Sequence, residues 1–462
     1  MKKSFLTAAI LLAMGAPAFG ADLVEVYKQA QQSDPQLAAA TAAHGAALEA
    51  KPQARAAILP KLSASAAKSQ VSAENNDAGT SDDYGTTSYS VSLLQPLYHH
   101  DYFVQLGQAN TRIAQANAEY AAAKQGLIVR TSSAYFNKLA AEDNLRFAQA
   151  EKAAIEQQLR QTQQRFDVGL TAITDVREAQ ARYDAAVAQE IAAQNQLDLT
   201  NEQLRELTGE EYARLNVLGD VPLVTPEPAD INAWVNTALA QNLSLLSAQA
   251  QAETAQKEIS RRRAAGFPTL DLTASVNHSD ADSDAVPSFN YDNDNTVVGL
   301  QVSWPFYQGG LVSSRTREAE QLYNQAKAGL DAQRRATVRQ TRDAYLGVQA
   351  GMSQVEALKQ ALTSAETALE ATTVGYEVGT RTAVDVLDAQ RQTFLAQRNY
   401  ASARYNYVLS ILRLKQAAGT LSETDLQQVN GWLAAPPTPA PTEPPAEAPA
   451  AAPVPEAPAA QP

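Results

Sequence analysis

The spacing of apolar positions predicts helices much longer than a globular domain needs. Residues 102–168 contain no proline, and at 1.5 Å per residue they would form a helix of roughly 100 Å. Its second half, and the segment that follows Gly169, repeat apolar or small residues at alternating intervals of three and four, which is typical of coiled coils. Because a short turn at Gly169 or Gly379 joins the two arms in each case, the arms must pair as antiparallel hairpins.

The heptad positions are the predicted contacts of these hairpins. They are Leu145, Ala148, Lys152, Ile155, Leu159, Thr162 and Phe166 in the first outgoing arm; Val176, Ala179, Tyr183, Ala186, Glu190, Ala193, Leu197, Thr200, Leu204 and Leu207 in its returning arm; and Val355, Leu358, Leu362, Ala365, Leu369, Thr372 and Tyr376 in the second outgoing arm. Packing between helices explains most of these positions without any further function.

A second pattern, of period two, predicts strands. Residues 270–277 alternate Leu, Leu, Ala and Val with Asp, Thr, Ser and Asn, and residues 298–304 and 88–93 alternate in the same way. One apolar and one polar face suit a barrel with lipid outside and water inside. The alternative is a half-buried strand of a soluble sheet, but no other segment remains to cover the apolar faces.

Two strand pairs give four strands per chain, which is too few to close a barrel. Lipid tolerates no open sheet edge, because each unpaired backbone group costs several kcal/mol there. The barrel must therefore be shared between chains, and the strands alone permit a dimer or a trimer. Aromatic residues at the junctions of strand and helix suit the membrane interface; they are Tyr98, Phe103, Trp304, Phe306 and Tyr307.

The whole pattern occurs twice, at an offset of about 210 residues. Residues 165–169 and 173–176 recur as residues 375–379 and 383–386, and Pro-Leu-Tyr at 96–98 matches Pro-Phe-Tyr at 305–307. Outside the repeats, Lys2, Lys3 and a short apolar run are typical of an export signal, although a buried helix is the alternative. The predicted domains are a signal peptide at 1–20, a first repeat at 21–218, a proline-containing linker at 219–229, a second repeat at 230–430, and a disordered Pro/Ala-rich tail at 431–462.

Composition narrows the function. The net charge of −13 argues against nucleic-acid binding, and the absence of cysteine excludes disulfides and thiolate zinc sites. No nucleophile, phosphate-binding or zinc-protease motif occurs, so we expect no enzyme, no cofactor and no metal. His99-His100 is the sole histidine pair. His278, Asp280, Asp282 and Asp284 imitate part of a calcium loop without its glycine and glutamate, so we interpret them as an acidic loop, matched by residues 75–84 in the first copy.

The segments VGLTAITDV at 168–176 and VGTRTAVDVLDAQ at 378–390 resemble the TolC outer-membrane efflux family, and the resemblance covers about 22–433. It implies a mainly α fold with a membrane β-barrel, in which a homotrimer builds a twelve-stranded barrel continuous with an α-helical coiled-coil tunnel through the periplasm. The implied partners are outer-membrane lipid, a periplasmic adaptor, and an inner-membrane pump or ABC transporter, and the implied cargo is drugs, secreted proteins or both.

The resemblance also assigns residues at the inner end of the tunnel. Asp385 and Asp388 correspond to gate carboxylates, and their spacing places them on one helix face, although a solvated face is the simpler reading. The gate-lock pairs fall on Asp175 with Tyr376 and on Thr174 with Arg381. The adaptor-docking residues are Val168, Gly169, Leu170, Val378, Gly379 and Thr380.

One position departs from the family, since Thr373 stands where an acidic partner for Gln158 is expected. That departure predicts a closed gate that is held less firmly. Two other functions stay open: a non-transporting, periplasm-spanning coiled-coil scaffold or adaptor, which leaves the strands unexplained, and a surface adhesin, which lacks a passenger or stalk repeat.

Overall fold

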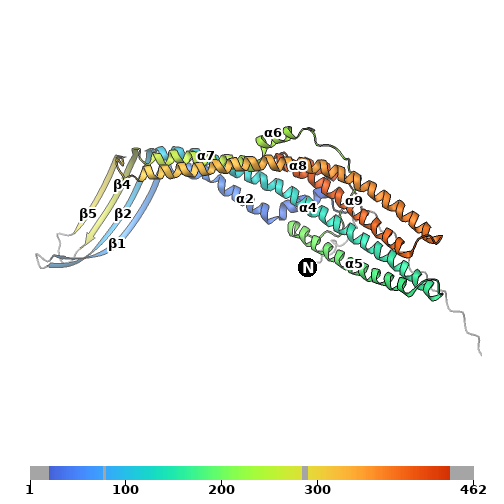
Figure 1. Cartoon of the computed structure of the whole chain (residues 1–462). Coiled ribbons are helices and arrows are strands. Elements are labelled where there is room, and N and C mark those ends of the chain that lie inside the picture. The colour runs from blue at the N-terminus through green and yellow to red at the C-terminus, as the bar shows by residue number, and fades with distance from the viewer. Residues whose placement is uncertain (1–19, 76–79, 283–289, 437–462) are drawn as a thin grey trace, which may run out of the picture.

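Strands occupy one end of the molecule and helical hairpins the other (Figure 1). The computed structural model describes residues 20–75, 80–282 and 290–436. The predicted signal peptide, except Gly20, lies outside the described residues, and so does the tail from residue 437. Of the helices described, none combines the length and the apolar character needed to cross a membrane.

Two very long helices run from the strands to the hairpin tips. They are α4 (His100–Asp167) and α8 (Leu311–Glu377), of 68 and 67 residues, and α5 (Ile173–Thr208) and α9 (Ala383–Ala418) return from the tips. The predicted helix at 102–168 is therefore confirmed, with its start two residues earlier. At each turn a glycine adopts positive φ, 78° at Gly169 and 80° at Gly379, a conformation that side chains with a Cβ disfavour.

The heptad pattern describes the packing of both hairpins correctly. In α4, Ala148, Ile155 and Thr162 are buried at intervals of seven residues, and in α5 Ala179, Ala186 and Ala193 are buried at the same interval. Every other predicted heptad position is buried or half-buried. Small residues at these contacts let the two arms approach closely.

The remaining described helices are shorter. In the first repeat these are α1 (Leu23–Ser33), α2 (Pro35–Leu48) and α3 (Ala50–Ala56), and in the second they are α6 (Ile231–Gln241), α7 (Leu243–Ala264) and α10 (Glu423–Asn430). Helix α7 packs along both α4 and α8. The main core lies where the repeats meet, around Tyr135, Phe136 and Leu412, which are fully buried.

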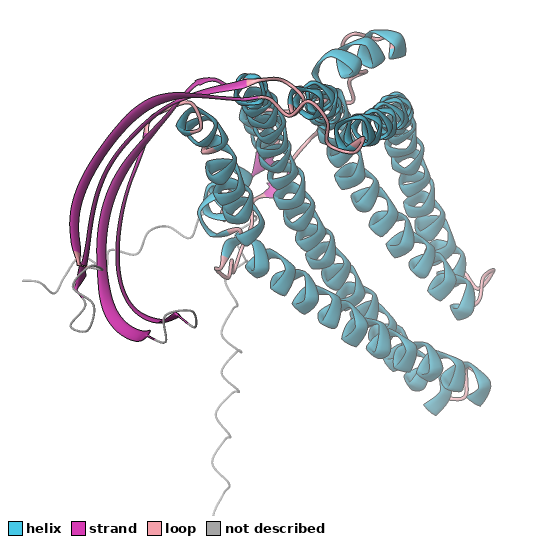
Figure 2. Cartoon of the chain, turned by 90° about the vertical axis from the view of Figure 1, so that its left-hand side faces the viewer, coloured by secondary structure: helices cyan, strands magenta, loops and turns pink. Residues whose placement is uncertain are grey.

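The four long strands form one antiparallel sheet in the order β1 (Lys61–Asn75), β2 (Thr80–Tyr98), β4 (Thr269–Asp282) and β5 (Tyr291–Ser303). Figure 2 shows the strands bending together into a single curved sheet. One face carries apolar side chains in register, such as Val91 opposite Val276. The other carries hydroxyl pairs, including Ser63 with Ser92 at 2.7 Å between oxygens. The predicted alternation is thus confirmed.

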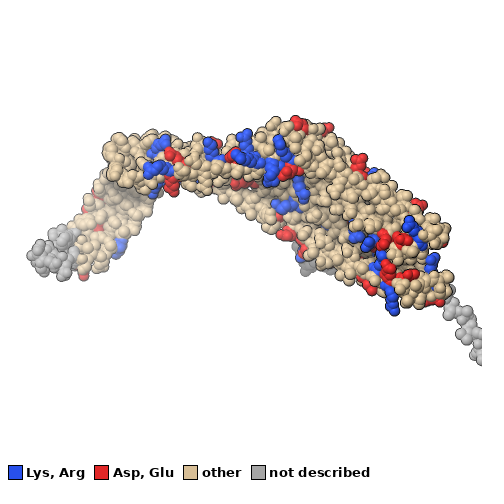
Figure 3. Space-filling model, viewed as in Figure 1, with Lys and Arg blue, Asp and Glu red and all other residues tan. Residues whose placement is uncertain are grey.

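None of the described residues covers the apolar face of the sheet. Val298, Leu300 and Val302 are among the most exposed large apolar side chains of the described residues. Few charged side chains lie over the strands in the view of Figure 3, whereas the hairpin tips carry many. Strands β1 and β5 each leave one edge unpaired, since they stand at the two ends of the strand order.

Two predicted loops are too long, because the strands extend beyond their apolar pattern; residues 76–79 of the first lie outside the described residues. Residues 80–84, predicted as loop, belong to β2 and pair with residues 71–75. His278, Asp280 and Asp282 lie in β4, while Asp284 lies outside the described residues. Beyond the apolar part a strand can be polar on both faces, so alternation ends before the backbone pairing does.

The predicted start of the tail is also too early. Residues 431–436 are ordered against the body, and β6 (Leu433–Ala434) pairs with β3 (Val217–Leu218). Trp432 and Leu433 pack on the main core, which gives this segment the apolar contacts that the rest of 431–462 lacks in its sequence. Residues 219–230 form neither helix nor strand.

Candidate functional site: the hairpin tips

The two hairpin turns present matching apolar side chains to solvent. Val168 and Val378 are each 69% exposed, and Leu170 is also strongly exposed. Backbone hydrogen bonds close both turns, from Leu170 N–H to the carbonyl oxygen of Arg165 and from Thr380 N–H to that of Gly375, each at 2.8 Å. The structure therefore places the predicted adaptor-docking residues together at the outermost surface of the tips.

Asp385 lies in the first turn of α9, where it forms a capping box with Thr382. The carboxylate accepts hydrogen bonds from the backbone N–H and the hydroxyl of Thr382, both at 2.9 Å. In return, Asp385 N–H donates to the Thr382 hydroxyl. The backbone and side-chain hydrogen bonds from Thr382 lower the pKa of Asp385, so this exposed carboxylate carries its full charge at neutral pH.

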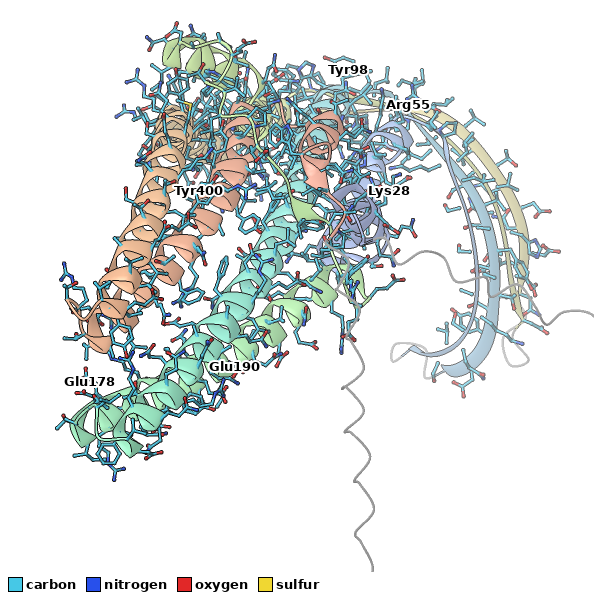
Figure 4. All side chains as sticks on the ribbon, turned by 90° about the vertical axis from the view of Figure 1, so that its right-hand side faces the viewer. Lys28, Arg55, Tyr98, Glu178, Glu190 and Tyr400 are labelled. Carbon is cyan, nitrogen blue, oxygen red and sulfur yellow. The ribbon has the colours of Figure 1, made fainter. Side chains whose placement is uncertain are left out.

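Asp388 contacts the other hairpin, which sequence reasoning did not anticipate. Its Oδ1 accepts a hydrogen bond from Arg182 Nη1 on α5 at 2.7 Å. The second nitrogen of Arg182 lies 3.2 Å from Glu178, one helical turn earlier on α5. Figure 4 places Glu178 near the free end of this hairpin, with the end of the α8–α9 hairpin beside it.

Neither gate-lock pair forms within one protomer, as far as the structure describes the tips. The Asp175 carboxylate accepts a hydrogen bond from the Thr171 hydroxyl and lies 3.5 Å from the Thr174 hydroxyl. The Tyr376 ring instead lies under the Arg165 guanidinium, 4.6 Å from the ring centroid. Asp175 is held by its own turn and Tyr376 faces α4, so these pairs stay predictions for contacts made in an assembly.

A groove of about 670 Å³ separates the two hairpins just above the tips. Gln158 and Thr373 both line it. Within the described residues, the side-chain nitrogen of buried Gln158 has no hydrogen-bond partner, whereas the Thr373 hydroxyl donates to the carbonyl oxygen of Leu369 at 2.8 Å. Thr373 therefore does not pair with the Gln158 amide.

Two further contacts join the hairpins inside a protomer. Ile155, Ala186 and Leu387 form a small apolar cluster that links α4, α5 and α9. Higher up, Arg398 Nη2 of α9 lies 3.0 Å from Glu151 Oε2 of α4, with both side chains largely buried. Ile155 and Ala186 are predicted heptad positions, whereas Leu387 was not predicted, and an ion pair between distant helices carries no local sequence signal.

Histidine and acidic residues make local pairs rather than a metal centre. His99 Nε2 lies 3.0 Å from Asp271 Oδ1 at the corner between β2 and α4, and the His99 ring stacks on Tyr102. In the part of the chain that the structure describes, no group of three His, Asp or Glu side chains could hold a metal ion.

One known family matches both halves of this arrangement. The family model described as "Outer membrane efflux protein" matches residues 26–210 and 234–420. The chain belongs to this family. The two matched ranges confirm the internal repeat, and membership identifies a channel rather than an enzyme, located in the outer membrane with a periplasmic helical extension.

Individual relatives agree with this assignment. Outer membrane protein TolC of Vibrio cholerae is 39% identical over 427 residues, covering 92% of this chain and 97% of that protein. The alkaline protease secretion protein AprF of Pseudomonas aeruginosa is 31% identical, covering 95% of this chain and 92% of that protein. The CmeC outer membrane channel of Campylobacter jejuni shares the fold, with a TM-score of 0.74 at 16% identity over 94% of this chain and 98% of that one.

Proposed function

We propose that three copies of this chain form an exit duct that carries drugs, proteins or both from an inner-membrane pump or ABC transporter to the exterior. The observation that carries the proposal is the curved four-stranded sheet, with two unpaired edges and an exposed apolar face, joined to helices of roughly 100 Å. Three chains supply twelve strands (3 × 4) and pair every edge, as lipid requires.

Docking to a periplasmic adaptor is the second element of the proposal. Val168, Leu170 and Val378 give each protomer two exposed apolar turns of the same design, which suit a repeated contact with a helical partner. A scaffold without a channel would need these turns as well. It would have no use, however, for a sheet whose apolar face the chain leaves uncovered.

The third element is a gate at the tips. In a trimer, Asp385 and Asp388 would form two rings of three carboxylates each around the axis, which attract cations. Asp175, Thr174, Tyr376 and Arg381 would close the gate through contacts between protomers. Without an acidic residue at position 373 to accept from the Gln158 amide, the closed state would be held less firmly.

The relatives indicate two classes of cargo. One relative is named for alkaline protease secretion and the matched family for efflux, so both kinds of cargo belong to the proposal. Deleting the gene and comparing drug susceptibility with the profile of secreted proteins would separate the two. A strain unchanged in both respects would contradict the transport function.

The architecture has its own test. The detergent-extracted protein should have the mass of a trimer, and the double variant Tyr376→Phe with Arg381→Ser should conduct more than the wild type in planar bilayers. Each lost hydrogen bond weakens the closed tip by about 0.5–1.5 kcal/mol, or about 1.5–3 if charged, in each protomer. A stable monomer that conducts ions would refute the shared barrel, and a double variant that conducts like the wild type would refute the gate.

A further inference from the structure

The two predicted gate carboxylates of each protomer have different surroundings. The Asp385 carboxylate accepts hydrogen bonds from Thr382 through Oδ2, and its Oδ1 accepts none from the described residues. Asp388 has its Oδ1 against the Arg182 guanidinium at 2.7 Å and lies 3.9 Å from Arg391 on its own helix. Asp385 therefore has no ion-pair partner among the described residues and can attract a cation from solution, whereas Asp388 is already paired with a cation.

The Arg182–Asp388 bridge is better held than an ordinary surface pair. Exposed ion pairs are weak because both long side chains must be ordered and water screens the charges. Here the Arg182 side chain is only 24% exposed, and Glu178 binds its second nitrogen and fixes the plane of the guanidinium. Burial lowers the pKa of Arg182, but hydrogen bonds to Asp388 and Glu178 outweigh burial and raise it overall, so the positive charge is permanent.

The apolar contacts beside the bridge also fix its geometry. Ala186 lies one turn beyond Arg182 on α5, and Leu387 directly precedes Asp388 on α9; both belong to the apolar cluster with Ile155. The same packing that joins the hairpins therefore brings Arg182 to Asp388. The two residues are 206 positions apart in the sequence and come from different repeats.

We propose that Arg182 sets the charge of the channel constriction by pairing with Asp388, which leaves Asp385 as the carboxylate that selects and binds cations. The inference rests on the proposed trimeric channel. Counting Asp385, Asp388 and Arg182, six carboxylates (2 × 3) face three cations, a net charge of −3 (−6 + 3) instead of −6. Glu178 and Arg391, which flank the bridge, add charges that cancel (−3 + 3).

Charge variants distinguish this role sharply, because the two single substitutions move the net charge in opposite directions. Arg182→Gln raises the negative charge from −3 to −6 (three copies of −1). Asp388→Asn removes it altogether, because three Arg182 cations then face three Asp385 carboxylates. The double variant returns to −3. A bridge with a merely structural role would give both single variants the same phenotype, since both break it.

The experiment measures the reversal potential in a KCl gradient, and the half-blocking concentration of Mg²⁺, for single trimers in planar bilayers. Arg182→Gln should increase cation selectivity and lower the half-blocking Mg²⁺ concentration by roughly fivefold or more, as Coulomb attraction to the added charge requires. Asp388→Asn should nearly abolish selectivity, and the double variant should match the wild type. Arg182→Lys keeps the charge and should also behave like the wild type.

Arg177→Gln is the matched control, because Arg177 is exposed on the same helix and has no ion-pair partner among the described residues. A double variant that behaves like Asp388→Asn, with Arg182→Gln no different from Arg177→Gln, would overturn the inference. Asp385→Asn distinguishes a failure of this inference from a failure of the proposed gate. If it lowers selectivity, the gate stands whatever Arg182 does; if neither Asp385→Asn nor Asp388→Asn changes selectivity, the tip is not the constriction and both proposals fail.

Discussion

Breaking the ion pair between Glu151 and Arg398 should weaken the contact between the two hairpins more than any other single substitution. Arg398 Nη2 lies 3.0 Å from Glu151 Oε2, and the two side chains are 21% and 11% exposed. Arg398→Gln would leave the Glu151 carboxylate between α4 and α9 without its ion-pair partner, although the charge of Arg391 still acts on it. Removing one partner of a fully buried pair costs about 3–5 kcal/mol; because this pair reaches solvent in part, we expect about 2 kcal/mol.

The loss of stability in Arg398→Gln should depend on pH, and the direction of this dependence follows from the pKa of Glu151. Burial raises the pKa of Glu151 above its ordinary value, and Arg398 opposes that rise. A folded-state pKa above the unfolded one means that the protonated acid favours the fold, and that this contribution disappears as pH rises through the folded pKa. Without Arg398 the folded pKa rises further. The deficit of Arg398→Gln should therefore be largest near pH 7 and shrink toward pH 5.

Urea unfolding of the detergent-extracted protein, followed by far-UV circular dichroism at both pH values, tests this prediction. Arg335→Gln is the control, since Arg335 forms an equally short bond of 2.8 Å to Asp331 but is 80% exposed, and such pairs contribute about 0–1 kcal/mol. Adding Glu151→Gln to Arg398→Gln should recover at least half of the loss. The reasoning is refuted if Arg398→Gln is as mild as the control, or if the double variant is as unstable as Arg398→Gln alone.

Three further predictions concern residues away from the hairpin tips and the segment that contains β6. Gly419→Ala should destabilise the fold severely in thermal melts, because φ is 79° and the new Cβ would overlap the carbonyl oxygen of Gln241. Gly329→Ala, in open space on α8, should be neutral or slightly stabilising. Truncation after residue 436 should leave the mass of the oligomer unchanged, whereas truncation after residue 430 removes β6 and should lower the melting temperature. Burial would raise the pKa of Glu258, but hydrogen bonds from Arg261 and Gln108 lower this pKa to about 2. The ionised Glu258 therefore stabilises the fold at neutral pH, and this contribution is lost as pH falls from about 4.5 toward 2. Glu258→Gln should melt at a lower temperature than the wild type at pH 7 and at nearly the same temperature at pH 2.

The parts of the fold that follow local periodicity could be predicted from the sequence. The α4–α5 hairpin depends on contacts at intervals of three and four and on one glycine, and the central part of β4 depends on alternation, so each is visible within a few dozen residues. The ends of the strands could not be predicted in this way. Polar residues such as Asp280 are paired by backbone hydrogen bonds, which leave no side-chain pattern.

Contacts between the two repeats were equally invisible in the sequence. Arg182 appeared as one arginine among several on a polar helix face, and nothing near it indicates that Asp388 is its partner. The resemblance to a family could predict the gate carboxylates, because it maps the family's functional positions onto this sequence. It could not supply the charge that balances one of them, because that charge depends on how α5 meets α9 in this chain.

The unpaired amide in the groove leads to a last prediction. Among the described residues, the Gln158 side-chain nitrogen has no hydrogen-bond partner, and Thr373 lines the same groove from α8. Thr373→Glu would place a carboxylate within the groove and give the amide a charged acceptor, a bond of about 1.5–3 kcal/mol in each protomer. We expect the tip to close more firmly, with at least tenfold lower conductance in planar bilayers. Thr373→Gln, equal in length but uncharged, should have a smaller effect. If Thr373→Glu conducts like the wild type while the trimer stays intact, the groove between the hairpins does not control closure.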